Sequence, residues 1–142
     1  MFFIELTNRC NLRCPICPRS DAVKGRGLGF MDFDLYKYII DSLSEYGAGY
    51  VGLNRFGESL LYPRFLEALE YAKRKQLPEL VLVTNATLLT KEMSEGIVDL
   101  GLDTIRMSLD SLDPEEYAAG RIGAKLDNTL ANIDYLLSQP LS

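Results

Sequence analysis

Apolar segments that alternate with amphipathic segments, four times in succession, limit the folds open to this chain more than any other feature. The apolar segments are typical of strands and lie at 2–6, 50–56, 80–84 and 104–109. The third carries the run Leu80–Val83, which is apolar on both faces, as strands inside parallel sheets are. A helix after each strand predicts a parallel sheet with right-handed crossovers and helices on the outside.

The amphipathic segments have the apolar spacing of helices. The helix at 32–46 is expected to begin at Asp32, whose side chain can cap it, and to stop at Gly47. Three further helices are expected: one opened by Pro63 and running through Ala72, one over 91–100 that stops at Gly101, and one with Leu126, Leu130, Ile133 and Leu137 on one face.

Four such units are too few to close a barrel. An eight-unit barrel needs about 250 residues, and the chain has 142. The length suits one domain, because a chain of this size buries roughly two-thirds of its extended surface. The predicted fold class is therefore α/β, with about four consecutive βα units and a parallel sheet, either as a partial (βα) barrel or as a small open sheet.

Charge and cysteine content exclude several classes of protein. A net charge of −5 does not support a general nucleic-acid-binding surface. No apolar run approaches the roughly 18 residues that cross a bilayer, and the N-terminus lacks the charged start and cleavage site of a signal peptide. Three crowded cysteines leave one unpaired, which excludes a disulfide scaffold. We therefore expect a cytoplasmic protein that binds neither nucleic acid nor a membrane.

Histidine is absent, and this restricts the available chemistry. Its absence excludes histidine triads, histidine-ligated zinc and imidazole bases. Between positions 9 and 26, five Lys and Arg residues accompany a single acid, Asp21, so this region carries a formal excess of four positive charges. Catalysis must therefore use cysteine, carboxylate, hydroxyl or a bound cofactor.

The cysteines are Cys10, Cys14 and Cys17, at a C-x3-C-x2-C spacing just after the first strand. Three thiolates on one short loop can reach three corners of a small inorganic cluster, and soft sulfur ligands favour iron–sulfur clusters, zinc or copper(I). A four-iron cluster usually takes four cysteines, so three would leave one iron open to a substrate or cofactor. The nearby positive charges would offset those of the thiolates and the cluster.

Two alternatives remain open for the cysteines. A structural zinc site would need a carboxylate or an external fourth ligand, whereas such sites are nearly always closed by Cys or His. A dithiol redox loop between Cys14 and Cys17 would resemble the C-x-x-C of thioredoxin-like proteins, but Cys10 would then be surplus. Spacing alone does not separate zinc from iron.

The stretch from Glu5 to Arg19, ELTNRCNLRCPICPR, resembles the signature of the radical S-adenosylmethionine (radical SAM) superfamily. It is most similar to the peptide-modifying members that carry an additional C-terminal cluster (SPASM-type) domain. Many members have an aromatic residue just before the third cysteine, where this chain has Ile16. The resemblance implies a 4Fe–4S cluster on Cys10, Cys14 and Cys17, with S-adenosylmethionine as the second cofactor.

The resemblance continues at the end of the second strand. Gly57 and Glu58 match a Gly-Gly-Glu motif that contacts the methionine amino group in the family. The first glycine of that motif is Phe56 here, and the proline that commonly follows is Ser59. The implied chemistry is sensible, because glycine permits close backbone approach and a carboxylate pairs with an ammonium.

Three more polar residues belong to the implied cofactor site. Asn85 follows the third strand, and Ser108 and Asp110 lie at the end of the fourth. Ser108 is the expected partner of the ribose hydroxyls, while Asn85 and Asp110 are also ordinary turn residues. Arg121 is interpreted either as a partner of the cofactor carboxylate or as a solvated arginine. Because the site residues and cysteines all follow strands, they are expected at the carboxyl edge of the sheet, where α/β active sites lie.

The function that the resemblance implies is that of a radical SAM enzyme. One electron from the reduced cluster cleaves S-adenosylmethionine into methionine and a 5'-deoxyadenosyl radical, which takes a hydrogen atom from a substrate. Family analogy points to a peptide or protein substrate and to an electron donor such as a flavodoxin or ferredoxin.

The length of the chain bears on this expectation. Family cores usually have six βα units, so residues 1–142 are expected to form a truncated radical SAM core domain. The alternative is a non-catalytic half-barrel that binds an iron–sulfur cluster or zinc and needs a partner. The open edge of the fourth strand favours a dimer or a partner chain. The glycine-rich segment 25–29 lacks the Lys and Ser/Thr of a nucleotide loop and is expected to be a flexible connector.

Overall fold

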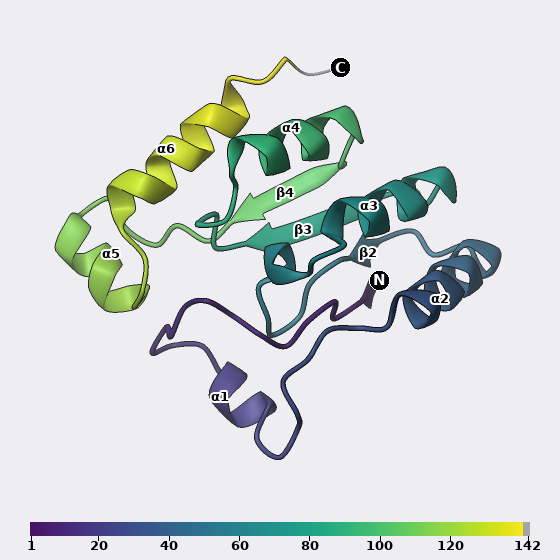
Figure 1. Ribbon diagram of the computed structural model, residues 1–142, viewed down its shortest axis with the longest axis horizontal. Coiled ribbons are helices and arrows are strands. Elements are labelled where there is room, and N and C mark those ends of the chain that lie inside the picture. Colours follow the sequence, from purple (N-terminus) through teal and green to yellow (C-terminus); the bar gives the residue numbers. More distant parts are fainter. Residues whose placement is uncertain (141–142) are drawn as a thin grey trace.

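The computed structural model describes residues 1–140, apart from the side chains of Ser20 and Ala22, and it confirms the parallel sheet (Figure 1). The strands are paired in the order of the sequence, and all pairs are parallel. They are β1 (Phe2–Phe3), β2 (Val51–Gly52), β3 (Leu80–Thr84) and β4 (Thr104–Met107). The fold is therefore an α/β partial barrel with two free sheet edges, at β1 and β4.

The first two strands are shorter than predicted, because other segments take up their backbone groups. Ile4 still donates to the Gly52 carbonyl, but the Leu6 carbonyl accepts from the amide of Met31 instead of from β2. Thr7 forms an isolated antiparallel bridge with Phe30. The segment that returns from the cysteine loop thus replaces β2 as the neighbour of the chain just beyond β1.

Seven helices lie among the described residues. They are α1 (Arg19–Ala22), α2 (Phe33–Tyr46), the 3-10 helix η1 (Ser59–Leu61), α3 (Phe65–Arg74), α4 (Lys91–Asp99), α5 (Pro114–Gly120) and α6 (Leu126–Leu137). Figure 1 shows α2, α3, α4 and α6 following one another over the sheet, and each contacts the next. None of the helices within residues 1–140 is long and apolar enough to cross a bilayer.

The predicted and observed ends of the helices agree at some capping residues and differ at others. The side chain of Asp32 accepts from the amide of Leu35, and Gly47 ends α2 in the left-handed region, both as expected. The helix expected to open at Pro63 begins two residues later, at Phe65, because η1 occupies the preceding turn. Helix α5 was not predicted, although Asp113 caps it through the amides of Glu115 and Glu116.

The last helix buries a slightly different face from the one expected. Leu126, Thr129, Ile133 and Leu136 are its buried residues. Leu137, which was predicted on this face, is 70% exposed. The spacing of three and four residues keeps the buried stripe against α4, which α6 contacts directly.

The hydrophobic core lies between the sheet and this helix layer. Alternate residues of the strands and their extensions face the helices and are buried: Ile4, Leu6, Val51, Leu53, Leu80 and Leu82. Tyr36 of α2 is buried with them, and its hydroxyl donates to the Ala68 carbonyl at 2.7 Å. The core holds the carboxyl ends of the strands together, and the polar residues that follow them meet there.

Candidate cluster and cofactor site

The cysteine loop, residues 10–17, begins four residues beyond Leu6, the last core residue of the β1 segment. Cys10 and Cys14 are half-buried, Cys17 is exposed, and all three thiols are free. The amide of Cys17 donates to the Cys14 carbonyl at 3.1 Å, which closes a turn between these two residues. The loop encloses a cavity of about 340 Å³ that is lined by all three cysteines.

A second cavity of about 150 Å³ adjoins the first and brings the cysteines together with residues from the later strands. Its lining residues are Cys10, Leu12, Cys14, Cys17, Asn54, Arg55, Phe56, Gly57, Glu58, Val83, Thr84, Asn85, Ser108 and Arg121. Gly57, Glu58, Asn85 and Ser108, singled out in the sequence, therefore share one cavity with the three cysteines. Asp110 does not line it.

Glu58 is buried at the centre of this arrangement, with 3% of its surface exposed. Its carboxylate accepts from the Thr84 hydroxyl at 2.8 Å, the Asn85 amide at 2.8 Å and the Leu60 amide at 3.2 Å. Burial raises the pKa of Glu58, while these three hydrogen bonds favour the charged form and oppose that rise. The carboxylate thus links the ends of β2 and β3 and caps η1.

Gly57 is required by a close approach between two backbone segments. A Cβ atom at this position would lie 2.7 Å from the Arg9 carbonyl oxygen and closer still to that of Thr7. The neighbouring Glu58 amide donates to the Arg9 carbonyl at 2.8 Å. The close approach expected from the Gly-Glu pair is therefore made to the segment just before Cys10.

Asn85 connects the third strand to the cysteine loop. Its side-chain amide donates to Asn11 Oδ1 at 3.0 Å and lies 4.0 Å from Cys10 Sγ. Thr87 closes this group, because it donates to Asn85 Oδ1 and accepts from Asn11 Nδ2 at 2.8 Å. The turn after β3 and the loop after β1 are thus joined by side chains 74 residues apart.

The turn that carries Asn85 has an unusual backbone. Ala86 adopts φ 61°, in the left-handed region that favours glycine. Asn132 of α6 donates to the carbonyls of Ala86 at 3.0 Å and Thr87 at 3.2 Å, and so holds this turn from behind. Sequence reasoning did not find Asn132, since its partners lie about 45 residues away.

Asp110, which follows β4, orients an arginine that enters the cavity from the end of α5. Asp110 Oδ2 accepts from Arg121 Nε at 2.7 Å, and Arg121 Nη1 lies 3.7 Å from Cys14 Sγ. The Arg121 side chain is 14% exposed, so it is not a solvated arginine. Burial alone would lower the pKa of Arg121, but its contacts with Asp110 and Cys14 raise it. Asp110 therefore acts from outside the cavity, by orienting Arg121.

Asn54 is a cavity residue that sequence reasoning missed. It follows Leu53 at the end of β2, and its Oδ1 atom is buried without a hydrogen-bond partner among the described residues. A buried acceptor without a donor is costly, so a bound group with an N–H or O–H would be favoured here. The signal that could have found it is its position, because it is a polar residue directly after an apolar strand.

Burial is the main factor that opposes formation of the Cys10 thiolate in the metal-free chain. Burial raises the pKa of the Cys10 thiol, and the negative charge of Glu58 adds to that rise. The Leu12 amide, 3.4 Å from the sulfur, and the positive charge of Arg19 act in the opposite direction. Metal binding would therefore have to displace a proton from Cys10.

The thiols are not arranged around a single ion. Among the residues described, no three Cys, His, Asp or Glu side chains come close enough together to hold one metal ion. A single zinc requires such convergence, because its ligands lie within about 2.3 Å of one centre. A cluster places its cysteine ligands on different iron atoms, so three separated thiols around one cavity are compatible with a cluster.

Comparisons with known proteins identify the family. The family model described as "Radical SAM superfamily" matches residues 4–140. The chain therefore belongs to the radical SAM superfamily, whose enzymes use a 4Fe–4S cluster and S-adenosylmethionine and need a reductant and a substrate.

Two curated relatives cover most of the chain. It is 31% identical over 133 residues to "Probable GTP 3',8-cyclase" of Methanococcus maripaludis, which covers 94% of this chain and 44% of that protein. It is 33% identical over 111 residues to "Tungsten-containing aldehyde ferredoxin oxidoreductase cofactor-modifying protein" of Pyrococcus furiosus, with coverage of 78% and 30%. The chain thus spans less than half the length of these relatives.

Solved structures share the fold. SuiB of Streptococcus suis, bound to S-adenosylmethionine, matches with a TM-score of 0.76 and 20% identity over 95% of this chain and 29% of SuiB. BtrN in complex with AdoMet and 2-DOIA matches with a TM-score of 0.67 and 23% identity, with coverage of 90% and 54%. At these identities the similarity shows a shared fold.

Proposed function

We propose that Cys10, Cys14 and Cys17 hold a 4Fe–4S cluster and that this chain is the radical-generating core of a radical SAM enzyme. The observation that supports this most strongly is the shared cavity, which joins three separated thiols to residues from the ends of the other strands. When bound, the cluster and S-adenosylmethionine supply one-electron cleavage to methionine and a 5'-deoxyadenosyl radical, which takes a hydrogen atom from the substrate.

The residues of this chain have separate roles in the proposal. Arg121, oriented by Asp110, attracts the carboxylate of the cofactor, and the free acceptor of Asn54 takes one of its N–H or O–H groups. Ser108 binds a ribose hydroxyl. Its own hydroxyl has no hydrogen-bond partner within residues 1–140, so it is available to a ligand.

Gly57, Glu58 and Asn85 support the site in this proposal by joining its walls. Gly57 allows the loop after β2 to pack on the segment before Cys10, and Glu58 ties that loop to β3. The ammonium of the cofactor would add a fourth donor to the Glu58 carboxylate, beyond the three that the protein provides. Asn85 keeps Asn11, next to Cys10, in register with β3.

The substrate and partners belong to the same proposal. The SPASM-type resemblance favours a peptide, whereas the curated cyclase relative favours a nucleotide such as GTP. Addition of GTP to the reduced, cluster-loaded chain separates these candidates, because only a nucleotide substrate would increase 5'-deoxyadenosine formation above the level with cofactor alone. A flavodoxin or ferredoxin donor, a cytoplasmic location and a dimer through the β4 edge remain predictions.

Anaerobic reconstitution with iron and sulfide tests the central proposal. The reduced chain should give the electron paramagnetic resonance signal of a four-iron cluster, and that signal should change when S-adenosylmethionine is added. Serine variants of each cysteine should lose most of the iron. A chain that binds the cluster but forms no 5'-deoxyadenosine would be the non-catalytic half-barrel, and a chain that binds zinc alone would contradict the proposal.

A further inference from the structure

We propose that Asn8 is a positioning residue that fixes both ends of the cysteine loop before any metal binds. Its side chain joins the start of the loop to the glycine-rich segment 25–29, and its backbone carbonyl holds the end of the loop through Arg19. This inference rests on the proposed function, in which Cys10 and Cys17 are cluster ligands. It concerns how the chain arranges those ligands, and it centres on Asn8, which lines neither of the two cavities described above.

The side chain of Asn8 pairs with the glycine-rich segment as a backbone strand would. Its Nδ2 atom donates to the Gly27 carbonyl at 2.9 Å, and its Oδ1 atom accepts from the Gly29 amide at 2.9 Å. Only 6% of the residue is exposed, so water cannot easily replace these bonds. Every polar atom of this amide group therefore has a protein partner of the matching kind.

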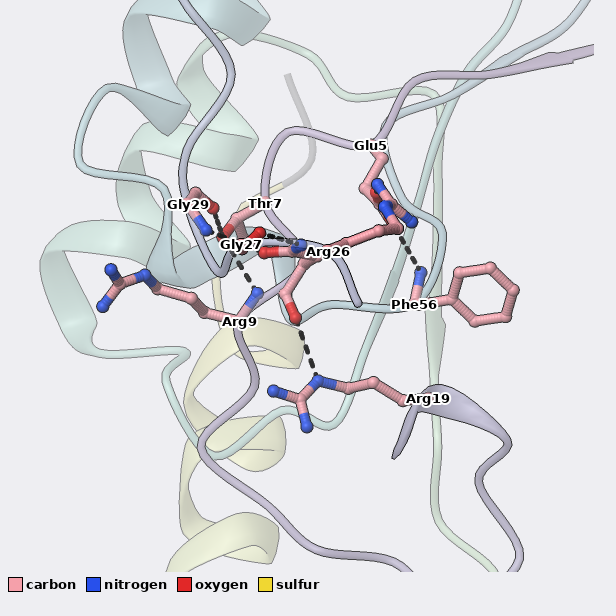
Figure 2. A network of polar contacts seen from close by, with 9 residues as sticks. Glu5, Thr7, Arg9, Arg19, Arg26, Gly27, Gly29 and Phe56 are labelled. Carbon is pink, nitrogen blue, oxygen red and sulfur yellow. Dashed lines mark hydrogen bonds and ion pairs between the residues drawn. The ribbon is translucent and has the colours of Figure 1, made fainter. Parts of the chain in front are cut away.

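Neighbouring contacts hold the same segment in place, as Figure 2 shows. The Thr7 hydroxyl donates to the Gly29 carbonyl at 2.6 Å. Arg26 forms an ion pair with Glu5 at 2.6 Å, and the Glu5 carboxylate also accepts from the Phe56 amide at 3.3 Å. The glycine-rich segment was expected to be a flexible connector, but these contacts attach it to the chain between β1 and Cys10.

The far end of the cysteine loop returns to the same residue. Arg19 lies two residues after Cys17, and its Nε atom donates to the Asn8 backbone carbonyl at 3.0 Å. The two ends of the loop, on either side of Cys10 and Cys17, are thus tied together at one point. Asn8 serves both functions, with its side chain holding the glycine-rich segment and its carbonyl holding Arg19.

Pre-ordering of this kind matters because the contacts of Asn85 and Arg121 restrain Cys10 and Cys14 but not Cys17. Cys17 is exposed, and ordering a free loop costs conformational entropy. A loop whose ends are already fixed has lost part of its conformational entropy during folding, so less entropy is lost when a cluster binds. Loss of the Asn8 side chain should therefore affect the loop more than the rest of the fold.

Hydrogen–deuterium exchange of the metal-free, full 142-residue chain tests this inference directly. Asn8→Ala removes both side-chain bonds and should increase amide exchange in residues 10–19 and 25–30 by roughly tenfold. Asn8→Asp keeps an acceptor for the Gly29 amide but loses the donor to Gly27, and should give an intermediate increase. Exchange in β3 and α4 should not change in either variant.

Gly27→Ala is the matched control. A Cβ atom at Gly27 meets nothing within 4 Å, and its carbonyl remains available to Asn8, so exchange should stay at the level of the natural chain. Arg19→Ala tests the far end of the loop by itself. Amide exchange should increase in residues 10–19, while residues 25–30 should stay protected. An Asn8→Ala increase confined to the Gly29 amide, or spread evenly over the fold, would overturn the inference.

Cluster binding in the same variants distinguishes this inference from the proposed function. Asn8→Ala should take up iron several times more slowly than the natural chain and give a broader paramagnetic signal, with partial recovery in Asn8→Asp. If the natural chain binds no cluster, the proposed function fails while the exchange result still decides the role of Asn8. If the natural chain binds a cluster and Asn8→Ala exchanges normally, only the inference fails.

Discussion

The two sides of the cysteine cavity are built differently. On the β2–β3 side, Glu58, Thr84 and Asn85 are buried, and each is hydrogen-bonded to protein partners. On the β4 side, Ser108 is half-exposed with a free hydroxyl, and Asp110 is exposed beside Arg121. Burying polar groups is costly unless they are paired. Apart from the unpaired Asn54 oxygen, the first side is therefore completed by folding, whereas the second is left open to a ligand.

This difference separates residues that build the site from residues that meet the cofactor. Changes on the β2–β3 side should lower stability first and cofactor binding as a consequence. Changes on the β4 side should leave stability nearly unchanged and alter the response to S-adenosylmethionine. The five predictions that follow test this division, in order of decreasing effect on stability.

Gly57→Ala should have the largest effect. The added Cβ would collide with the carbonyls of Thr7 and Arg9, which are backbone atoms and cannot rotate away. We expect the free energy of unfolding in urea to fall by about 3 kcal/mol or more. Gly49→Ala is the control, because a Cβ there meets nothing within 4 Å and should cost less than about 0.5 kcal/mol. Equal losses in the two variants would contradict this reading of Gly57.

Glu58→Ala should have the next largest effect and lower the free energy of unfolding by about 3 kcal/mol. It leaves the Thr84 hydroxyl and the Asn85 and Leu60 amides without their shared acceptor. Glu58→Gln keeps an acceptor and the side-chain volume, so it should lose less. Urea titrations of both variants at neutral pH measure the difference. If Glu58→Ala is as stable as the natural chain, the carboxylate does not hold β2 to β3.

The pH dependence of Glu58 follows from its raised pKa. The folded chain binds this proton more tightly than the unfolded chain, so the contribution of Glu58 is fully present below the ordinary glutamate pKa and declines as pH rises through the raised value. The stability of the natural chain relative to Glu58→Gln should therefore decrease over this window. A difference that grows with pH would mean that hydrogen bonding outweighs burial.

Ala86→Gly should change stability by a smaller amount and in the favourable direction. Glycine relieves the left-handed backbone at φ 61°, with an expected gain of about 0.5–1 kcal/mol. Gln76→Gly is matched to it, since Gln76 has φ 54° at an exposed position outside the cavity. Both variants should unfold at higher urea concentrations, but only Ala86→Gly should alter amide exchange at Asn11 and Thr87. A loss of stability in Ala86→Gly would contradict the explanation that the left-handed backbone at Ala86 is unfavourable.

Ser108→Ala should have the smallest effect on stability, within about 0.5 kcal/mol, because its hydroxyl bonds to no group of the described chain. Binding of S-adenosylmethionine to the cluster-loaded chain should weaken about five- to tenfold, as expected for one lost hydrogen bond. The cofactor-induced change in the paramagnetic signal measures this affinity. Unchanged affinity would place the ribose elsewhere.

Much of the fold follows from local patterns in the sequence. The apolar run Leu80–Val83 predicted a buried parallel strand, and Asp32 and Gly47 predicted both ends of α2, because a strand interior and a helix cap depend on near neighbours. The predicted extents of β1 and β2 were wrong because they depend on segments that are distant in the sequence. The partner that replaces β2 beside Leu6 is Met31, a choice made by contact between distant segments.

The sequence by itself determined the chemical inventory of the site: three cysteines at a fixed spacing, no histidine, and polar residues after each strand. Only the tertiary structure decided what each residue does there. Arg121 lies beside Cys14 although 107 positions separate them, and Asn54, a lining residue of the cavity, has a buried oxygen without a partner among the described residues. Spacing is a local property of the chain, whereas the burial of Asn54 Oδ1 and the pairing of Arg121 depend on which distant segments pack together.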